Sequence, residues 1–281
     1  MTRSGLYVRL ALVLAGVLAS PTAFAGKPSV VAPVHTRLAK GETGQVRSVY
    51  DGDSFTLASG LWVELAAIKA PKRASKKSGA PAQPLAKQAR AALGRLIGGK
   101  EVHLYYSGDR RDRYERAQAQ VFTSAQNQAG LWVQKAMVEQ GLAYVYPWNG
   151  DGLDFTPLYE AEQKARQARR GIWNSKVTNG FYDIRTPDPN GLAQMVDTVQ
   201  IVEGIIVSVA DVRGTIYMNF GADYKTDFTI AIAKKNRKAF KNPKQNPLSL
   251  AGARVRVRGY IELSNGPVIW LDSPARLEIL D

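Results

Sequence analysis

The sequence contains no cysteine and only two histidines, His35 and His103. The absence of cysteine excludes disulfides, thiolate metal sites, cysteine nucleophiles and lipid attachment to a thiol. Two histidines so far apart argue against a histidine metal cluster or a serine-histidine triad. Beyond a short N-terminal run, no apolar segment approaches the roughly 18 residues that a membrane span needs. We therefore expect no membrane span and no thiol chemistry in the mature chain.

The N-terminus has the three parts of a secretory signal. Arg3 supplies the positive charge, Leu10 to Ala19 form the apolar run, and Ala23-Phe24-Ala25 match a small-residue cleavage site. We expect residues 1–25 to be a signal peptide cleaved after Ala25, followed by an N-terminal arm over residues 26–43. The mature protein is then expected to be periplasmic or secreted.

Acidic residues are few relative to basic ones. The chain has 38 Lys and Arg against 24 Asp and Glu, and removal of the signal with Arg3 and Arg9 leaves 36 against 24, or +12. Residues 26–176 hold 23 basic and 13 acidic residues, so +10 of this excess lies in the first half of the mature chain. Such a charge predicts a polyanionic partner: nucleic acid, anionic lipid head groups or acidic glycans.

The segment from Val46 to Leu57 places Asp51-Gly52-Asp53 between two apolar stretches with strand-like alternation. Asp-Gly is a strong hairpin signal in any protein. Two carboxylates beside a glycine are also compatible with a metal or phosphate site. The turn alone leaves both interpretations open.

The pattern that follows predicts a small barrel with helices. Residues 61–68 alternate as a strand, and the connection 69–83 is basic, either simply solvated or in contact with a polyanion. Helical periodicity is expected over 84–97, 131–140 and 158–170, and strands over 101–106 and 117–123.

Five motifs occur in the order found in a known protein family. They are DGDS, LWVELAAIKAP, DRYER, GLAYVY and ARQARRGIW, and together they resemble the staphylococcal nuclease (thermonuclease) family from Gly44 to Trp173. The resemblance implies a mainly β, α+β fold: a five-stranded OB barrel with packed helices, here over residues 44–176.

The second half is expected to be a separate domain. Pro187, Pro189 and Gly191 indicate a linker over 177–197. Strands are predicted within 201–209, 215–220, 228–233, 254–263, 267–271 and 276–280, in an order that repeats the first barrel. We predict a second, smaller OB-like β-barrel domain over 198–281, and its IYMNFG and DFTIAI segments resemble C-terminal domains that follow such nuclease modules.

Two features of the second half have alternative interpretations. Arg254, Arg256 and Arg258 share one face of a strand, which is either an ordinary solvent-facing strand or a phosphate-tracking stripe. The aromatic residues are either core filling or base-stacking surfaces. They are Tyr217, Phe220, Phe228, Tyr260 and Trp270.

The resemblance also implies a site. Nucleases of this family use one calcium ion held by two aspartates, a glutamate as general base, and two arginines on the phosphate. Asp53 falls on the first metal-ligand position with Asp51 beside it, and Arg116 falls on the second arginine. Four residues fall on positions that line the nucleotide pocket: Arg113, Tyr114, Tyr144 and Tyr146.

The other positions are substituted. Glu64 replaces the first arginine, Lys69 the second metal ligand and Lys72 the general base. An ammonium repels a dication, and protonated lysine cannot accept a proton from water. We expect Lys69 to pair with Asp53 or Glu64 and fill the cation site. No cofactor is expected, and calcium only if the site still functions.

Three functions remain open from the sequence. The first is a degenerate thermonuclease-like protein, a pseudoenzyme that binds nucleic acid or another polyanion without efficient hydrolysis. The second is a metal-dependent phosphodiesterase, an endonuclease with a modified site in which Glu64 acts as base or ligand. The third is an envelope protein-interaction scaffold. Oligomeric state is left undetermined.

Overall fold

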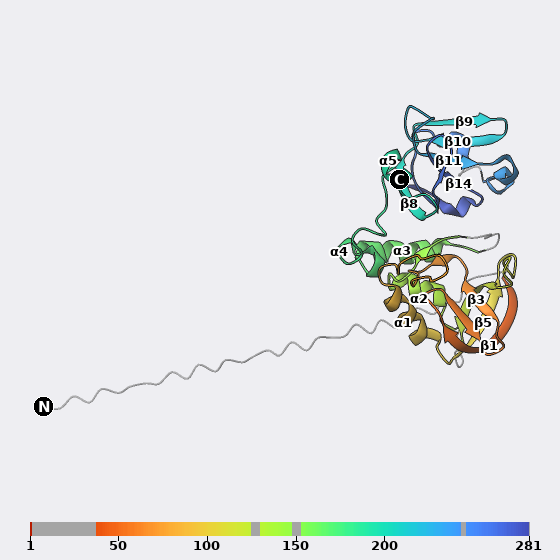
Figure 1. Ribbon diagram of the computed structural model, residues 1–281, viewed down its shortest axis with the longest axis vertical. Helices are drawn as coiled ribbons and strands as arrows, with labels where there is room; N and C mark the ends of the chain where they lie inside the picture. Colours follow the sequence, from red (N-terminus) through yellow and green to blue (C-terminus); the bar gives the residue numbers. More distant parts are fainter. Residues whose placement is uncertain (2–37, 125–129, 148–152, 243–245, 281) are drawn as a thin grey trace.

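The computed structural model describes residues 1, 38–124, 130–147, 153–242 and 246–280. Figure 1 shows two parts, one above the other, with the N-terminal part below. The expected signal peptide, apart from Met1, and most of the expected arm lie outside the described residues. Among the residues that are described, no helix combines the length and apolarity required to cross a membrane.

A closed five-stranded barrel forms the N-terminal part. Its strands are β1 (Ala39–Val49), β2 (Ser54–Leu57), β3 (Trp62–Leu65), β5 (Glu101–Tyr106) and β6 (Ala117–Thr123). They pair in the order β1-β2-β3-β6-β5, and only β3 and β6 run parallel. This confirms the predicted barrel. Its first strand starts at Ala39, within the segment expected as an arm.

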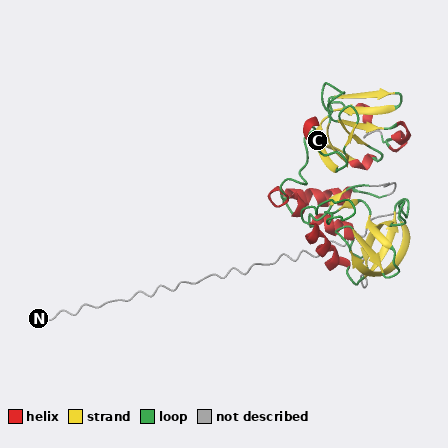
Figure 2. Cartoon of the chain, in the orientation of Figure 1, coloured by secondary structure: helices red, strands yellow, loops and turns green. Residues whose placement is uncertain are grey.

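Helices cover one side of this barrel (Figure 2). They are α1 (Ala86–Ile97), α2 (Val133–Glu139) and α3 (Thr156–Gln167), followed by η1 (Gly171–Trp173) and α4 (Ser175–Thr178). The apolar stripe of α1 predicted from the sequence is buried: Ala89, Leu93 and Ile97 are each fully inaccessible. Two short strands, β4 (Ile68–Lys69) and β7 (Tyr144–Val145), pair with each other and join the barrel to the helices.

The C-terminal part is β-rich, as predicted. Its strands are β8 (Val199–Ile205), β9 (Ser208–Val212), β10 (Thr215–Asn219), β11 (Thr229–Ile232), β12 (Arg254–Tyr260), β13 (Glu262–Leu263), β14 (Pro267–Trp270) and β15 (Leu277–Leu280). The short helices η2 (Lys234–Ala239), η4 (Pro247–Ser249) and η5 (Pro274–Arg276) lie between them.

These strands form two sheets, ordered β13-β14-β11-β10-β9 and β15-β12-β8. β9 follows β8 after two residues, and β13 follows β12 after one, so each pair is one strand that bends from the second sheet into the first. With the pairs joined, the neighbours run β8/9-β10-β11-β14-β12/13, and β11 and β14 are parallel. This is the strand order of the first barrel, with β15 added at the edge of β12.

The segment expected as a linker is partly structured. It contains α5 (Pro189–Ala193), whose first turn is capped by Asp188 through the backbone N–H groups of Asn190 and Gly191. Leu192 is 1% exposed and belongs to the core of the C-terminal part. The sequence did not predict this short helix, because Pro187 and Pro189 are typical of a linker that interrupts secondary structure.

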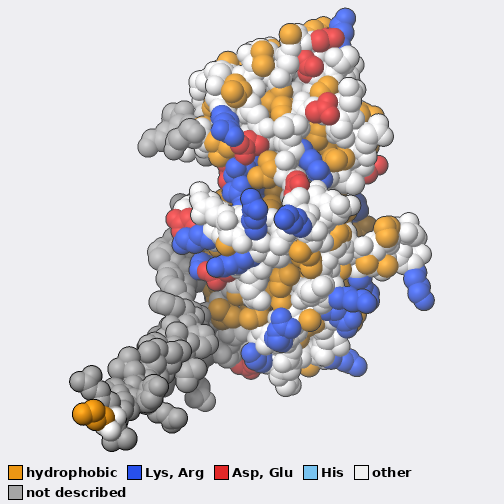
Figure 3. All heavy atoms as spheres, turned by 90° about the vertical axis from the view of Figure 1, so that its left-hand side faces the viewer, with side chains coloured by type: hydrophobic (Ala, Val, Ile, Leu, Met, Phe, Trp, Pro, Cys, Tyr) orange, Lys and Arg blue, Asp and Glu red, His pale blue; other side chains and the backbone are white. Residues whose placement is uncertain are grey.

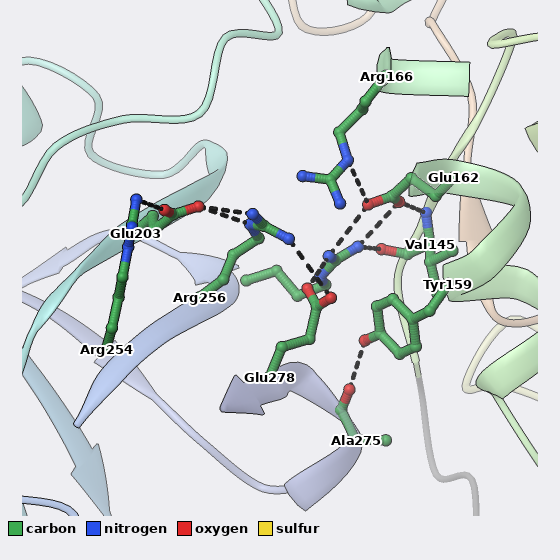
Figure 4. A network of polar contacts seen from close by, with 10 residues as sticks. Val145, Tyr159, Glu162, Arg166, Glu203, Arg254, Arg256, Ala275 and Glu278 are labelled. Carbon is green, nitrogen blue, oxygen red and sulfur yellow. Dashed lines mark hydrogen bonds and ion pairs between the residues drawn. The ribbon is translucent and has the colours of Figure 1, made fainter. Parts of the chain in front are cut away.

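Buried charges join the two parts (Figure 4). Arg258 of β12 and Glu162 of α3 are both fully buried, and Arg258 Nη1 donates to Glu162 Oε2 at 3.0 Å and to the carbonyl of Val145 at 2.7 Å. Arg258 also pairs with Glu278, and its guanidinium lies 4.7 Å from the ring centroid of Tyr159. Breaking such a pair costs about 3–5 kcal/mol, because the remaining charge stays desolvated.

The arginine stripe therefore has a role that neither interpretation anticipated. Arg258 faces the nuclease-like part, Arg256 bridges Glu203 and Glu278, and only Arg254 is largely exposed. All three arginines pair with carboxylates, which are Glu162, Glu203 and Glu278. We call the contact between the two parts around Arg258 and Glu162 the seam. The stripe is neither a solvent-facing row nor a free track for phosphates.

Candidate catalytic centre

The turn between β1 and β2 is a hairpin and also carries the candidate site. Tyr50 N donates to Ser54 O, and Val49 is paired with Phe55. A Cβ on Gly52 would lie 2.6 Å from the Cβ atoms of both Ala70 and Ala89. Glycine is required because the turn packs tightly against the connection after β4 and against α1. The hairpin interpretation of this turn is therefore confirmed, and the packed turn leaves the Asp53 side chain buried.

Lys72 holds the two aspartates together. Its Nζ contacts Asp53 Oδ1 directly and lies 3.4 Å from Asp51 Oδ2. Asp53 is buried, and its other oxygen accepts the Ala70 N–H at 2.8 Å. Asp51 also accepts from Ser54 Oγ. The ammonium thus occupies the position between the two carboxylates.

Electrostatics keep this lysine charged. Burial acts to lower the pKa of Lys72, but Asp53, Asp51 and Glu64 outweigh it and raise the pKa above its ordinary value. Burial is the largest influence on Asp53 and raises its pKa to about 7 against the opposing charge of Lys72. For Asp51, burial is outweighed by Lys72 and by hydrogen bonds, so its pKa is lowered. A lysine whose pKa is raised cannot act as a general base near neutral pH.

A calcium ion does not fit this donor set. Calcium takes six to eight oxygen ligands, whereas the centre offers the carboxylates of Asp51 and Asp53, both engaged by Lys72. Among the residues that the structure describes, no three His, Asp or Glu side chains group together as a metal site would require. At 4 Å and an effective dielectric constant of 20, a dication and an ammonium repel by about 8 kcal/mol.

The prediction for Lys69 needs correction. The amine in contact with Asp53 belongs to Lys72, and Glu64 pairs with Arg116. Lys69 Nζ lies 3.5 Å from the hydroxyl of Tyr260, and 4.9 Å and 5.6 Å from the ring centroids of Tyr146 and Tyr260. Lys69 does not reach Asp53 because Ile68 and Lys69 form β4, and the pairing of β4 with β7 directs the Lys69 side chain toward the tyrosines and the C-terminal part.

Arg116 is held by acids. Its Nη1 donates to Glu64 Oε1 at 2.8 Å, and its Nε donates to Asp112 Oδ2 at 2.7 Å. Glu64 and Asp112 therefore neutralise Arg116. A phosphate at this point would have to compete with two carboxylates for Arg116.

The four residues expected to line a nucleotide pocket are divided by the structure. Tyr114 is 62% exposed, and the guanidinium carbons of Arg113 and Arg116 lie 4.8 Å and 5.2 Å from its ring centroid. Tyr146 is 1% exposed, with Arg276 of the C-terminal part 4.5 Å above its ring. Arg113 and Tyr114 thus face solvent, whereas Tyr146 is covered by the C-terminal part.

Tyr144 lines a cavity of about 470 Å³ at the seam. Lys69, Lys72 and Gln83 contribute from the nuclease-like part, Tyr182 and Arg185 from the expected linker, and Thr198, Gln200 and Tyr260 from the C-terminal part. No sequence signal connected Tyr182 or Tyr260 with the site. Their separation from Asp53 in sequence exceeds 120 residues. Hydrogen bonds to Gln83 and Pro84 hold Tyr182 against the nuclease-like part, and contact between the two parts brings Tyr260 to Lys69.

Comparison with known proteins identifies relatives of the N-terminal part. Residues 62–175 match the family model described as staphylococcal nuclease homologue. An uncharacterized protein of Bacillus anthracis is 32% identical over 147 residues, covering 50% of this chain and 63% of that protein. A probable staphylococcal-like nuclease of Oryza sativa subsp. japonica is 28% identical over 138 residues, 49% of this chain and 36% of that protein. The chain thus spans less than two thirds of these two relatives.

A micrococcal nuclease of Shigella flexneri is 30% identical over 138 residues, which are 47% of this chain and 73% of that protein. The barrel, its helices and the aspartate turn define a nuclease-type OB domain. The chain belongs to the staphylococcal nuclease homologue family. The family model ends at residue 175, so the C-terminal part is not identified by it.

Proposed function

We propose that this chain is an exported member of the nuclease family that binds nucleic acid, or another polyanion of similar chemistry, without calcium-dependent hydrolysis. The observation that carries the proposal is the Lys72 ammonium seated between Asp51 and Asp53. The same residue stands at the family's general-base position, so one substitution removes the base and places a cation at the metal position.

The surroundings support loss of hydrolysis. A phosphodiester transition state needs fixed positive charge beside the scissile phosphate. Glu64 and Asp112 neutralise Arg116, and Glu64 is itself an acid where the family has an arginine. Four carboxylates, Asp51, Asp53, Glu64 and Asp112, thus share Lys72 and Arg116.

Retained binding is supported by charge and by exposed groups. Residues 26–176 keep an excess of ten basic residues. Figure 3 shows Lys and Arg side chains gathered over the lower part of the molecule and at the seam. Arg113 and Tyr114 remain accessible next to the centre. Such groups bind phosphates without a metal ion.

Two measurements on the purified mature chain test the proposal. Cleavage of end-labelled single-stranded DNA and RNA is followed in calcium and in EDTA, with a micrococcal nuclease as positive control. We expect no calcium-stimulated cleavage. Anisotropy titrations of the same oligonucleotides over a salt series should give an affinity that falls linearly with log salt.

The outcomes separate the alternatives. Calcium-stimulated cleavage that Asp53→Ala abolishes would establish the modified phosphodiesterase instead. Absence of binding even at low salt would favour the protein-interaction scaffold. Export is tested separately by the mass of the mature N-terminus, which should begin at Gly26.

A further inference from the structure

Two large aromatic side chains stack on the outside of the barrel. Tyr50 follows β1 and Trp62 begins β3; their ring centroids are 4.2 Å apart and the ring planes differ by 22°. Both residues are half-buried, and neither belongs to the hydrophobic core cluster. The outward positions of a barrel strand are usually polar, so a stacked aromatic pair there is unusual.

The pair adjoins the aspartate turn. Tyr50 directly precedes Asp51, and Trp62 shares the outward face of β3 with Glu64. Trp62 Nε1 donates to Glu64 Oε1 at 3.1 Å, and the same oxygen accepts from Arg116. The single polar group of the indole is therefore used within the protein. What the indole offers a ligand is apolar ring surface.

Cationic groups lie on both sides. The guanidinium of Arg73, an exposed residue of the basic connection, lies 5.9 Å from the Tyr50 ring centroid. Across the Glu64–Arg116 pair, exposed Tyr114 lies close to Arg113. Aromatic surface bordered by arginines is the arrangement that binds single-stranded nucleic acid, because every base has a face to stack and every linkage has a phosphate.

We propose that Tyr50 and Trp62 form a stacking platform for a base of a single strand, with Arg73 holding an adjacent phosphate. The inference rests on the proposed function and adds a preference for single strands over duplexes. Unpaired bases can reach the rings, whereas in a duplex the base faces are covered by neighbouring bases. Neither residue belongs to the motif positions that align with the family's site.

The test compares two ligands on the full mature chain: a twelve-residue oligothymidylate and an oligonucleotide of the same length made of abasic residues. Tyr50→Leu and Trp62→Leu should weaken thymidylate binding by about 5- to 150-fold, the equivalent of one lost stacking contact. Binding of the abasic oligonucleotide should not change. Tyr224→Leu, at a 61% exposed tyrosine of the C-terminal part, is the matched control and should leave both affinities unchanged.

The readouts separate this inference from the function on which it rests. If the unmodified chain binds neither oligonucleotide at low salt, the proposed function fails. If it binds both and the platform variants match it, or if they weaken both ligands equally, the platform is refuted and polyanion binding stands. Should both variants fold poorly, photo-crosslinking of a bromodeoxyuridine oligonucleotide to the unmodified chain replaces them. Crosslinks must then include Tyr50 or Trp62, and crosslinks confined to other segments would overturn the inference.

Discussion

Replacing Lys72 by methionine should destabilise the protein and alter its response to cations. Methionine preserves most of the side-chain length but removes the ammonium from Asp51 and Asp53. Removing one partner of a fully buried ion pair costs about 3–5 kcal/mol. The Asp53 side chain is 4% exposed but that of Lys72 is 40% exposed, so solvent screening lowers the expected cost to about 2–4 kcal/mol.

Urea unfolding of the unmodified chain and of Lys72→Met measures this cost. Lys76→Met is the control, because Lys76 lies in the same connection and is exposed; its effect should stay within about 0.5 kcal/mol. Equal stability of Lys72→Met and the unmodified chain would show that the ion pair does not hold the turn.

Calcium provides the second half of this test. The unmodified chain should show no calcium-dependent rise in its melting temperature. A Lys72→Glu variant replaces the ammonium beside Asp51 and Asp53 with a third carboxylate, and at a calcium concentration ten times the dissociation constant it should gain about 1.4 kcal/mol. Magnesium at equal ionic strength is the control. Calcium stabilisation of the unmodified chain would refute the argument that Lys72 fills the cation position.

Three further predictions concern other charges. Arg258→Met should cost about 3–5 kcal/mol in urea unfolding, because Glu162 loses this buried partner, and the added change Glu162→Gln should recover part of this cost. The control Arg254→Met, at a side chain 60% exposed, should cost less than about 1 kcal/mol. Equal effects of the two arginine variants would contradict a stabilising role for the buried pair. Glu64→Gln should release Arg116 from one carboxylate and tighten oligonucleotide binding a few-fold at low salt. If one phosphate contact is gained, the slope of log affinity against log salt should become steeper by about 0.7. Glu262→Gln, at an exposed residue, is the control, and an unchanged slope would show that Arg116 binds no phosphate. Burial acts to raise the pKa of Glu42, but hydrogen bonds from Tyr106 and Arg111 outweigh it and lower the pKa to about 2. The stabilisation from Glu42 is therefore complete above its unfolded pKa of about 4.3 and is lost as the pH falls toward 2, so Glu42→Gln should lose less unfolding free energy than the unmodified chain on acidification from about pH 5 to about pH 3; parallel pH profiles would refute this.

Local patterns in the sequence predicted most of the fold. The strands 101–106 and 117–123 have the predicted bounds, and the apolar stripe of α1 faces the core as its periodicity indicated. Hydrophobic alternation and turn residues act over a few positions, so they can be read from the chain alone. The substitutions inferred at Glu64, Lys69 and Lys72 rest on the register of the surrounding motifs and stay a prediction.

The partner of each charge was decided only by the tertiary structure. The sequence indicated that an amine would meet Asp53, but the β4–β7 pairing sends Lys69 toward Tyr260 and leaves Asp53 to Lys72. Period two placed the three arginines of β12 on one face, and the docking of the two parts then buried Arg258 against Glu162. Side-chain direction along a strand is a local property, whereas the charge that it meets depends on contacts between distant segments, as for Arg258 and Glu162, which are 96 residues apart.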